Sequence, residues 1–445
     1  MQKQISISGA GLVGSLLACF LAKRNSKITV YERRADSRLE GYVGGRSINL
    51  ALSERGWAAL DKVGLRKEIE PIALPMSGRV IHHQNGEKYF QPYGKEGQAI
   101  YSVSRGLLNE VLVNAAEKMG VQFLFNQHCV EVNFNTTEAI FENTETKQTS
   151  TIKSDVLLAA DGAYSEARYK MQRTHNFNIN QQHESHGYKE LCIPDLNGKH
   201  QIENNALHIW PRESFMMIAL PNLDGSFTCT LFAALHGENG FDMLKTESDV
   251  AAYFQKYFPD AVALMPTLAH DFFTNPTGSL VTVKCFPWKT KNTCLIGDAA
   301  HAVVPFYGQG MNCGFEDVRI LDELLTTHHE DWNKTLEEFQ NLRKPNADAI
   351  ADLALYNFIE MRDLSGRDDF QLRLKIEKRI AAAFPSQFQT LYGMVTFNQT
   401  PYFEAKKRGE KQAELLDEIM QLENIENLWQ EEIILQKAAE WLSKN

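Results

Sequence analysis

The sequence predicts an α/β fold, in which a Rossmann-type dinucleotide-binding domain is interleaved with a sheet-based domain and followed by a C-terminal helical region. Three observations predict this fold class. A strand, a glycine-rich turn, a helix and a second strand follow one another within about thirty residues of the N-terminus. Residues 188–283 contain several short strand-like segments, and the chain beyond Asn312 carries apolar residues at helical spacing.

Composition indicates a globular protein with two or three packed lobes. The chain has 445 residues, of which 43 % are hydrophobic and 23 % charged. Its net charge of −10 argues against a nucleic-acid partner, because phosphate binding needs a clustered basic face. Seven scattered cysteines without a CxxC pair indicate reduced thiols, which fits a cytoplasmic protein. Neither a signal peptide nor a membrane helix is expected, and the oligomeric state stays open.

The N-terminal unit has the pattern of an adenine dinucleotide site. Residues 5–8 read as a strand, residues 15–24 as a helix and residues 27–32 as the next strand. Between the first two, Gly9 permits a tight turn, Gly11 lets the backbone approach a pyrophosphate, and Gly14 allows the helix to pack on the strand. Glu32 can bond ribose hydroxyls and repels a 2′-phosphate, which favours FAD or NAD over NADP. Arg33 and Arg34 either soften that rule or lie in a solvated loop.

Two later elements favour FAD over NAD. Residues 155–160 form an apolar strand that ends in Asp161-Gly162, and a strand at residues 294–296 ends in Gly297-Asp298. A glycine-rich helix start at residues 308–312 follows. An aspartate after a strand can bond a ribityl hydroxyl, and such a helix start can place N–H groups against the flavin ring. A helix N-cap is the less favoured alternative for Asp298 alone.

The remaining segments complete the expected domains. Ser104 can N-cap a helix that runs to Met119, and residues 206–210, 215–220 and 226–232 read as strands. Residues 413–442 read as a pair of amphipathic helices. We predict a discontinuous FAD-binding domain at 1–75, 98–180 and 285–325, a substrate-binding sheet domain at 76–97 and 181–284, and a C-terminal helical region at 326–445.

The order of these motifs over the first 330 residues resembles the class A flavin aromatic hydroxylases, which have the fold of p-hydroxybenzoate hydroxylase. Stretches along nearly the whole chain are more specifically similar to the kynurenine 3-monooxygenase family. They lie at residues 45–53, 207–212, 215–222, 227–232 and 356–362. The last stretch is the most specific, because it lies outside the common flavin fold.

This resemblance implies hydroxylation of L-kynurenine to 3-hydroxy-L-kynurenine with NADPH and O2, a step of tryptophan degradation that leads to NAD biosynthesis. In such enzymes a non-covalent FAD is reduced, oxygen adds at its C4a position, and the hydroperoxide is attacked by the substrate ring. Catalysis then needs no catalytic side chain and no metal, but it needs a site that excludes water. His301 is therefore not assigned as a base, and a helix-start histidine near phosphate or solvent is the alternative.

The resemblance also implies a set of contact residues. Arg79 and Tyr93 correspond to a carboxylate-binding pair that Asn357 and Tyr392 join, since an arginine fork suits a carboxylate. The expected apolar slot consists of Leu207, Ile218, Leu220, Phe232, Phe306 and Met361. The expected cofactor contacts are Gly9, Gly11, Leu12, Val13, Gly14, Glu32, Arg33, Ala51, Arg105, Val130, Asp161, Asp298, Gly310, Met311 and Asn312.

Two features depart from the family pattern. Its mitochondrial-membrane members end in a hydrophobic anchor, whereas residues 410–445 are charged and amphipathic, so no membrane anchor is expected. The position of Tyr307 varies within the family, and no role follows for it. A hydroxylase of phenolic acids, another flavin enzyme of this fold and a flavin-binding sensor are the alternatives. The chain has no second GxGxxG turn that would locate NADPH.

Overall fold

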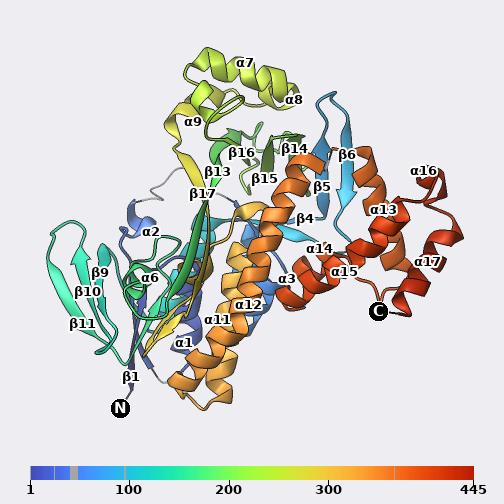
Figure 1. The fold of residues 1–445 in the computed structure, drawn as a ribbon. Coiled ribbons are helices and arrows are strands. Elements are labelled where there is room, and N and C mark those ends of the chain that lie inside the picture. The colour runs from blue at the N-terminus through green and yellow to red at the C-terminus, as the bar shows by residue number, and fades with distance from the viewer. Residues whose placement is uncertain (1, 25, 41–48, 95–96, 365, 445) are drawn as a thin grey trace.

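The computed structural model describes residues 2–24, 26–40, 49–94, 97–364 and 366–444. Residues 45–48 of the expected motif at 45–53 lie outside these ranges. The described strands form four sheets, and Figure 1 shows a lower body, an upper lobe and a helical region that carries the C-terminus. The α/β fold class predicted from the sequence is confirmed.

A six-stranded sheet forms the core of the lower body, in the order β18-β19-β12-β1-β2-β8. Its strands are β1 (Lys3–Ser8), β2 (Ser26–Tyr31), β8 (Gln122–Leu124), β12 (Val156–Ala159), β18 (Lys289–Thr290) and β19 (Thr293–Leu295). All pairs are parallel except β18 with β19. The central strands are apolar because helices cover the sheet. The helices of this body are α1 (Leu12–Ala22), α5 (Arg105–Lys118), α6 (Glu166–Met171), α10 (Asp298–His301) and α11 (Gly310–Thr327).

Two three-stranded sheets flank this core. One has the order β3-β7-β4, and the other has the order β11-β10-β9. Their strands are β3 (Asn49–Leu52), β4 (Ala73–Met76), β7 (Ile100–Ser104), β9 (Gln127–Asn133), β10 (Glu138–Asn143) and β11 (Thr149–Lys153). The neighbouring helices are α2 (Ser37–Glu40), α3 (Glu54–Val63), α4 (Arg66–Ile69) and η1 (Glu70–Ile72). As predicted, Ser104 caps α5, and its hydroxyl oxygen accepts a hydrogen bond from the Leu107 N–H at 3.5 Å.

The upper lobe is built on a seven-stranded sheet with the order β17-β13-β16-β15-β14-β5-β6. Its strands are β5 (Gly78–His82), β6 (Lys88–Pro92), β13 (Asn178–Ile193), β14 (Ala206–Arg212), β15 (Phe215–Pro221), β16 (Phe227–Ala234) and β17 (Thr277–Phe286). The long strands β13 and β17 run from the upper lobe down toward the lower body (Figure 1). Side chains along a strand alternate between the two faces, and both faces are covered here.

Helices cover the upper face of this sheet, and the sequence analysis, which found strand-like segments in this region, did not predict them. They are η2 (Phe241–Met243), α7 (Glu247–Tyr257), α8 (Pro259–Val262) and α9 (Leu268–Thr274). A capping box starts α7, with the Thr246 side chain and Asp249 bonded reciprocally to backbone N–H groups. Phe254 and Phe258 then share one buried apolar cluster with Trp210 and Leu231 of the sheet. Helices this short are unstable in isolation, and the burial of their apolar side chains against the sheet supplies the missing stability.

The C-terminal region is helical, as predicted. It contains α12 (Trp332–Ile359), the π-helical turn η4 (Glu360–Leu364), α13 (Asp368–Ala383), α14 (Leu391–Thr396), α15 (Tyr402–Met420), α16 (Ile425–Leu428) and α17 (Glu432–Leu442). The short helix η3 (Pro305–Tyr307) lies earlier in the chain, between α10 and α11. The expected pair of helices at residues 413–442 is α15 and α17, with the short α16 between them. Helix α12 crosses from the lower body to the upper lobe (Figure 1).

A buried network of charged side chains joins the lower body to α12. The Arg343 guanidinium lies 2.6 Å from an Asp317 oxygen and 2.7 Å from a Glu316 oxygen. The other Glu316 oxygen lies 2.5 Å from Arg55 of α3, and the other Asp317 oxygen lies 2.5 Å from His301 Nε2. Burial opposes ionisation of both carboxyls, but these cations hold the pKa of Glu316 and of Asp317 below their usual values.

We predict that Arg343→Met destabilises the fold by about 3–5 kcal/mol, because it leaves two buried carboxylates short of a partner. The measurement is the urea midpoint of unfolding. Lys344→Met is the matched control, since Lys344 forms a half-exposed pair with Asp348 one turn away and its loss should cost at most about 1 kcal/mol. Equal midpoints for the two variants would contradict a stabilising role for the network.

Candidate functional site

The predicted dinucleotide motifs meet at one edge of the six-stranded sheet. Strands β19, β12, β1 and β2 are neighbours and run parallel, so their carboxyl ends share an edge. These ends lead to Gly297-Asp298, Asp161, the glycine-rich turn at residues 9–14 and Glu32. Ligands of open α/β sheets bind at this edge.

The glycine-rich turn is closed at two glycines and open at the third. Gly9 has a φ of +100°, and a side chain at Gly14 would place its Cβ 2.0 Å from the Gly9 carbonyl oxygen. A Cβ at Gly11, in contrast, would meet no atom within 4 Å. The Glu32 carboxylate accepts hydrogen bonds from the Ala10 N–H at 2.8 Å and the Arg34 N–H at 3.0 Å. The turn therefore presents an open backbone at Gly11 beside a carboxylate, as a dinucleotide requires.

Asp161 lies against this turn. A Cβ on Gly9 would lie 2.4 Å from the Ala160 carbonyl oxygen and 3.0 Å from the Asp161 Cα. One Asp161 oxygen accepts from the Glu166 N–H at 3.0 Å, and the other is buried without a hydrogen-bond partner among the described residues. Burial raises the pKa of this carboxyl. An unpaired buried acceptor costs stability unless a ligand donates to it, and this fits an FAD hydroxyl.

The second glycine-rich element completes the edge. A Cβ at Gly297 would lie 3.1 Å from the Val13 side chain, so the exit of β19 touches the first turn. Helix α11 begins at Gly310, and the Asn312 side chain donates to the Ala51 and Gly308 carbonyl oxygens at 2.8 Å each. Asn312 also accepts from the Ser53 N–H at 2.9 Å. Its amide thus fixes the start of α11 to β3.

The other expected cofactor residues differ in exposure. Leu12 and Val13 start α1, and Met311 is half-buried at the start of α11. Arg105 is exposed at the first position of α5, and Val130 lies in β9. Asp298 and Arg33 are exposed.

The expected substrate residues of the sheet share one face. The register places Arg79 opposite Leu207. It places Ile209 opposite Ile218, and Met216 opposite Phe232. Residues directly opposite each other point to the same side of a sheet, and Leu220 follows Ile218 by two positions. This face is the lower one, which packs on η3, α12 and α14 instead of α7–α9. The apolar residues of the sheet that were expected to line a slot therefore share one face, and Leu207 and Ile218 pack against both apolar clusters on it.

Arg79 lies at the end of this surface among tyrosines. Its guanidinium carbon is 4.7 Å from the ring centre of Tyr392 and 5.4 Å from that of Tyr93, and these two rings stack at 5.3 Å. The Arg79 Nε and the Tyr93 hydroxyl are buried without a hydrogen-bond partner among the described residues. Burial raises the pKa of Tyr93 well above its usual value, so its hydroxyl keeps its proton. The pair offers unpaired donors to an anion.

The far wall of the slot comes from the C-terminal helices. The ring centre of Phe306 lies 4.9 Å from that of Phe232, and the ring stacks on Phe358 with 3.9 Å between the ring centres. The Asn357 amide donates to the Phe306 carbonyl oxygen at 2.7 Å, and Met361 is buried next to it. Asn357 thus orients the wall. Ala51 packs against the same slot and touches Gly308, so the slot adjoins the cofactor edge.

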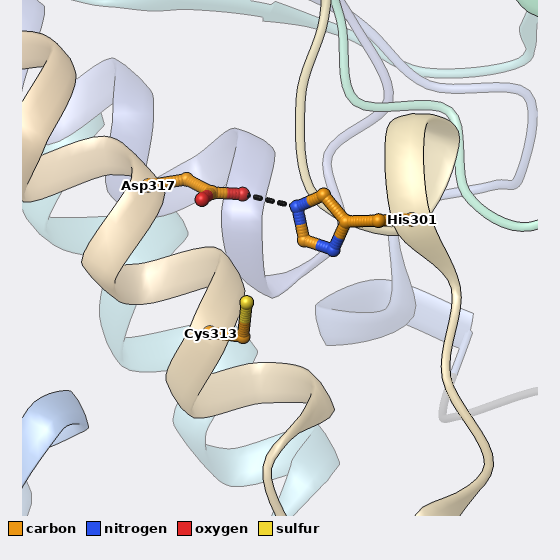
Figure 2. A group of neighbouring side chains, drawn as sticks. All are labelled: His301, Cys313 and Asp317. Atoms are coloured by element: carbon orange, nitrogen blue, oxygen red, sulfur yellow. Dashed lines mark hydrogen bonds and ion pairs between the residues drawn. The ribbon is translucent and has the colours of Figure 1, made fainter. Parts of the chain in front are cut away.

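His301 lies neither near solvent nor in a position to act as a base. It is buried at the end of α10, and its Nε2 points at Asp317 of α11 (Figure 2). Cys313 lies one turn before Asp317, so the three could suggest a metal site. Arg343 already neutralises Asp317, and burial raises the pKa of the Cys313 thiol well above its usual value. The cluster is an ion-pair network that sequence reasoning missed, although two acids between apolar residues Phe315 and Val318 were a signal.

Sequence comparison gives the family. Residues 2–354 match the family model described as an FAD binding domain. The chain is 45 % identical over 445 residues to a kynurenine 3-monooxygenase of Christiangramia forsetii, covering 100 % of this chain and 99 % of that protein. It is 44 % identical to a kynurenine 3-monooxygenase of Sus scrofa, covering 93 % and 88 %. Among the described residues, no helix is long and apolar enough to span a membrane.

Solved structures share the fold. The 2-methyl-3-hydroxypyridine-5-carboxylic acid oxygenase superposes with a TM-score of 0.68 at 18 % identity, covering 82 % of this chain and 94 % of that one. A tetracycline destructase gives a TM-score of 0.61 at 14 % identity, covering 80 % and 89 %. At these identities the likeness concerns the fold alone, whereas the full-length sequence relatives are far more similar. The chain therefore belongs to the kynurenine 3-monooxygenase family.

Proposed function

We propose that the protein is an FAD-dependent monooxygenase that hydroxylates L-kynurenine to 3-hydroxy-L-kynurenine with NADPH and O2. The unpaired Arg79 and Tyr93 donors at the end of an apolar slot support this best. L-kynurenine has a carboxylate at one end, which suits the Arg79 and Tyr93 donors, and an aminophenyl ketone at the other, which suits the apolar surface. Bound FAD supplies the oxygen-transfer chemistry once NADPH has reduced it.

The cofactor site is assigned to the carboxyl edge of the six-stranded sheet. The open backbone at Gly11 receives the pyrophosphate, and Glu32 faces the adenosine ribose. The unpaired oxygen of Asp161 accepts from the cofactor, and Asn312 holds the start of α11 in place. The neighbouring residues Leu12, Val13, Arg33, Ala51, Arg105, Val130, Asp298, Gly310 and Met311 complete the proposed set.

The substrate site is assigned to the lower face of the seven-stranded sheet. Arg79 and Tyr93 bind the carboxylate, and Tyr392 stacks beside them. Leu207, Ile218, Leu220 and Phe232 form one wall of the slot, while Phe306, Asn357 and Met361 form the other. Because these side chains are buried or half-buried, the bound ring leaves little room for water, and this protects the oxygen-transfer step.

The domain division predicted from the sequence is proposed with these roles. Residues 1–75, 98–180 and 285–325 bind the cofactor, 76–97 and 181–284 form the substrate sheet, and 326–445 cover it. We place the protein in the cytoplasm, since all seven cysteines are unpaired and buried. A reducing compartment suits that state.

Product analysis tests the proposed reaction. The purified FAD-loaded protein is incubated with NADPH, O2 and L-kynurenine, and the expected product is one oxygen atom heavier. p-Hydroxybenzoate in place of L-kynurenine is the control and should neither be hydroxylated nor speed NADPH oxidation. NADPH oxidation that yields hydrogen peroxide but no heavier product would overturn the kynurenine assignment and leave FAD binding intact.

Alanine substitutions at Gly11 and Gly14 test the cofactor site. Gly11→Ala should keep the fold, because nothing lies within 4 Å of the added Cβ, but it should weaken FAD binding about tenfold by obstructing the phosphates. Gly14→Ala should destabilise the protein itself, since its Cβ would collide with the Gly9 carbonyl. Circular dichroism and FAD titration separate the two effects. Unchanged FAD affinity in Gly11→Ala would place the cofactor elsewhere.

Replacement of Arg79 tests the carboxylate clamp. Arg79→Met should raise KM for L-kynurenine about 10- to 100-fold, because it removes charge-assisted hydrogen bonds. FAD content should stay unchanged. The control is Arg367→Met, since Arg367 is exposed and pairs only with Asp369 among the described residues. If both variants keep the wild-type KM, the carboxylate does not bind at Arg79.

A further inference from the structure

The proposed clamp leaves one charged group of the substrate without a partner. An α-amino acid carries an ammonium beside its carboxylate, and Arg79 would repel that ammonium. A buried cation is stabilised only where an acceptor, best a carboxylate, lies within reach. We therefore searched the elements around Arg79 for a carboxylate, on the premise that the proposed function holds.

Glu360 is placed to meet this requirement. It ends α12 and opens the π-helical turn η4, which packs against β14 and β15 of the slot. Asn357 precedes it by three positions and Met361 follows it directly, so it belongs to the turn that forms the slot wall. The Asn357 amide nitrogen lies 3.2 Å from the Met361 sulfur, and this closes the turn. Single π turns inside helices are frequent at functional sites.

Glu360 and Arg79 act on each other electrostatically but are not paired. Burial has the largest effect on both pKa values and opposes ionisation of both side chains. The charge of Glu360 raises the pKa of Arg79, and the charge of Arg79 lowers the pKa of Glu360, so each favours the charged form of the other. Yet no ion pair within 4.0 Å is formed by either side chain among the described residues. The Tyr93 hydroxyl, nine-tenths buried, is also unpartnered beside Arg79. A positive and a negative group that stay apart suit a zwitterion whose two charges lie between them.

A second carboxyl supports this arrangement. Burial and the neighbouring Glu360 raise the pKa of Glu377, on α13, to about 7. Glu360 thus disfavours a second negative charge on Glu377. Nearby cations have other partners, because Arg373 binds Asp417 and Lys378 donates to the Pro92 carbonyl oxygen at 2.8 Å. Arg373 still lowers the pKa of Glu360 electrostatically, but among the described residues no cation of α13 forms an ion pair with its carboxylate.

We propose that Glu360 accepts the α-ammonium of the substrate and makes the site select α-amino acids over the corresponding desamino acids. It is a specificity-determining residue. Arg79 binds the carboxylate and Glu360 binds the ammonium, while the apolar side chains contact the ring. A desamino acid would leave Glu360 unpaired and would bring its own carboxylate close to it.

Equilibrium binding tests this assignment. Flavin fluorescence of the FAD-loaded protein is titrated with L-kynurenine and with its desamino analogue, which keeps the ketone and the carboxylate. The wild type should prefer L-kynurenine, and Glu360→Gln should weaken L-kynurenine binding about tenfold or more while leaving the analogue unchanged or tighter. Glu360→Asp, which keeps the charge, should retain part of the preference and covers the case in which the glutamine variant fails to fold.

Asp363→Asn is the matched control, because Asp363 lies in the same π turn but pairs with Arg362. It should leave the preference of the wild type unchanged. If Glu360→Gln keeps the preference, or weakens both ligands equally, the ammonium does not bind at Glu360. If the wild type binds neither compound, the proposed function fails, and this assignment fails with it.

Discussion

The buried pairing of Arg343 with Glu316 and Asp317 is the constraint on which the geometry of both sites depends. Ions of this kind are stable inside a protein only when every charge has a partner, so the helices that carry them have little freedom to shift. Helix α11 brings the start at Gly310 to the cofactor edge, and α12 brings Asn357 to the slot. The network therefore ties the helix that begins at Gly310 to the helix that carries Asn357.

The two faces of the seven-stranded sheet divide the work of the upper lobe. One face packs against α7–α9 and contributes stability, with Trp210, Phe227 and Leu231 in its core. The other face is covered by η3, α12 and α14 and carries the slot. Since side chains alternate along each strand, one strand serves both purposes without competition. Helices from a distant part of the chain bury this face.

The parts of the fold that are specified locally could be predicted from the sequence. A strand, a glycine-rich turn and a helix occupy consecutive residues, so the four strand ends that form the cofactor edge could each be predicted from a local motif. Helix α7 could also have been found, because Thr246 and Asp249 have the spacing of a capping box. The proposed clamp could not be derived in this way, since Tyr392 lies about three hundred residues from Arg79 and Tyr93, and only the family resemblance joined them. The charged network was missed because its partners Arg55, His301 and Arg343 are far apart in the sequence, although the apolar neighbours of Glu316 and Asp317 were a signal that both acids are buried.

The division of the chain has a consequence for specificity. The match to the general FAD binding domain stops before Asn357, whereas the kynurenine 3-monooxygenase relatives align along nearly the whole chain. Asn357, Glu360 and Met361 fall just beyond that limit, on the turn where α12 changes from α- to π-helical hydrogen bonding. A π turn adds a residue and so rotates the side chains that follow it. Changes in this turn can alter which groups face the slot without moving the cofactor edge, which is held from the other end of α12 by Arg343.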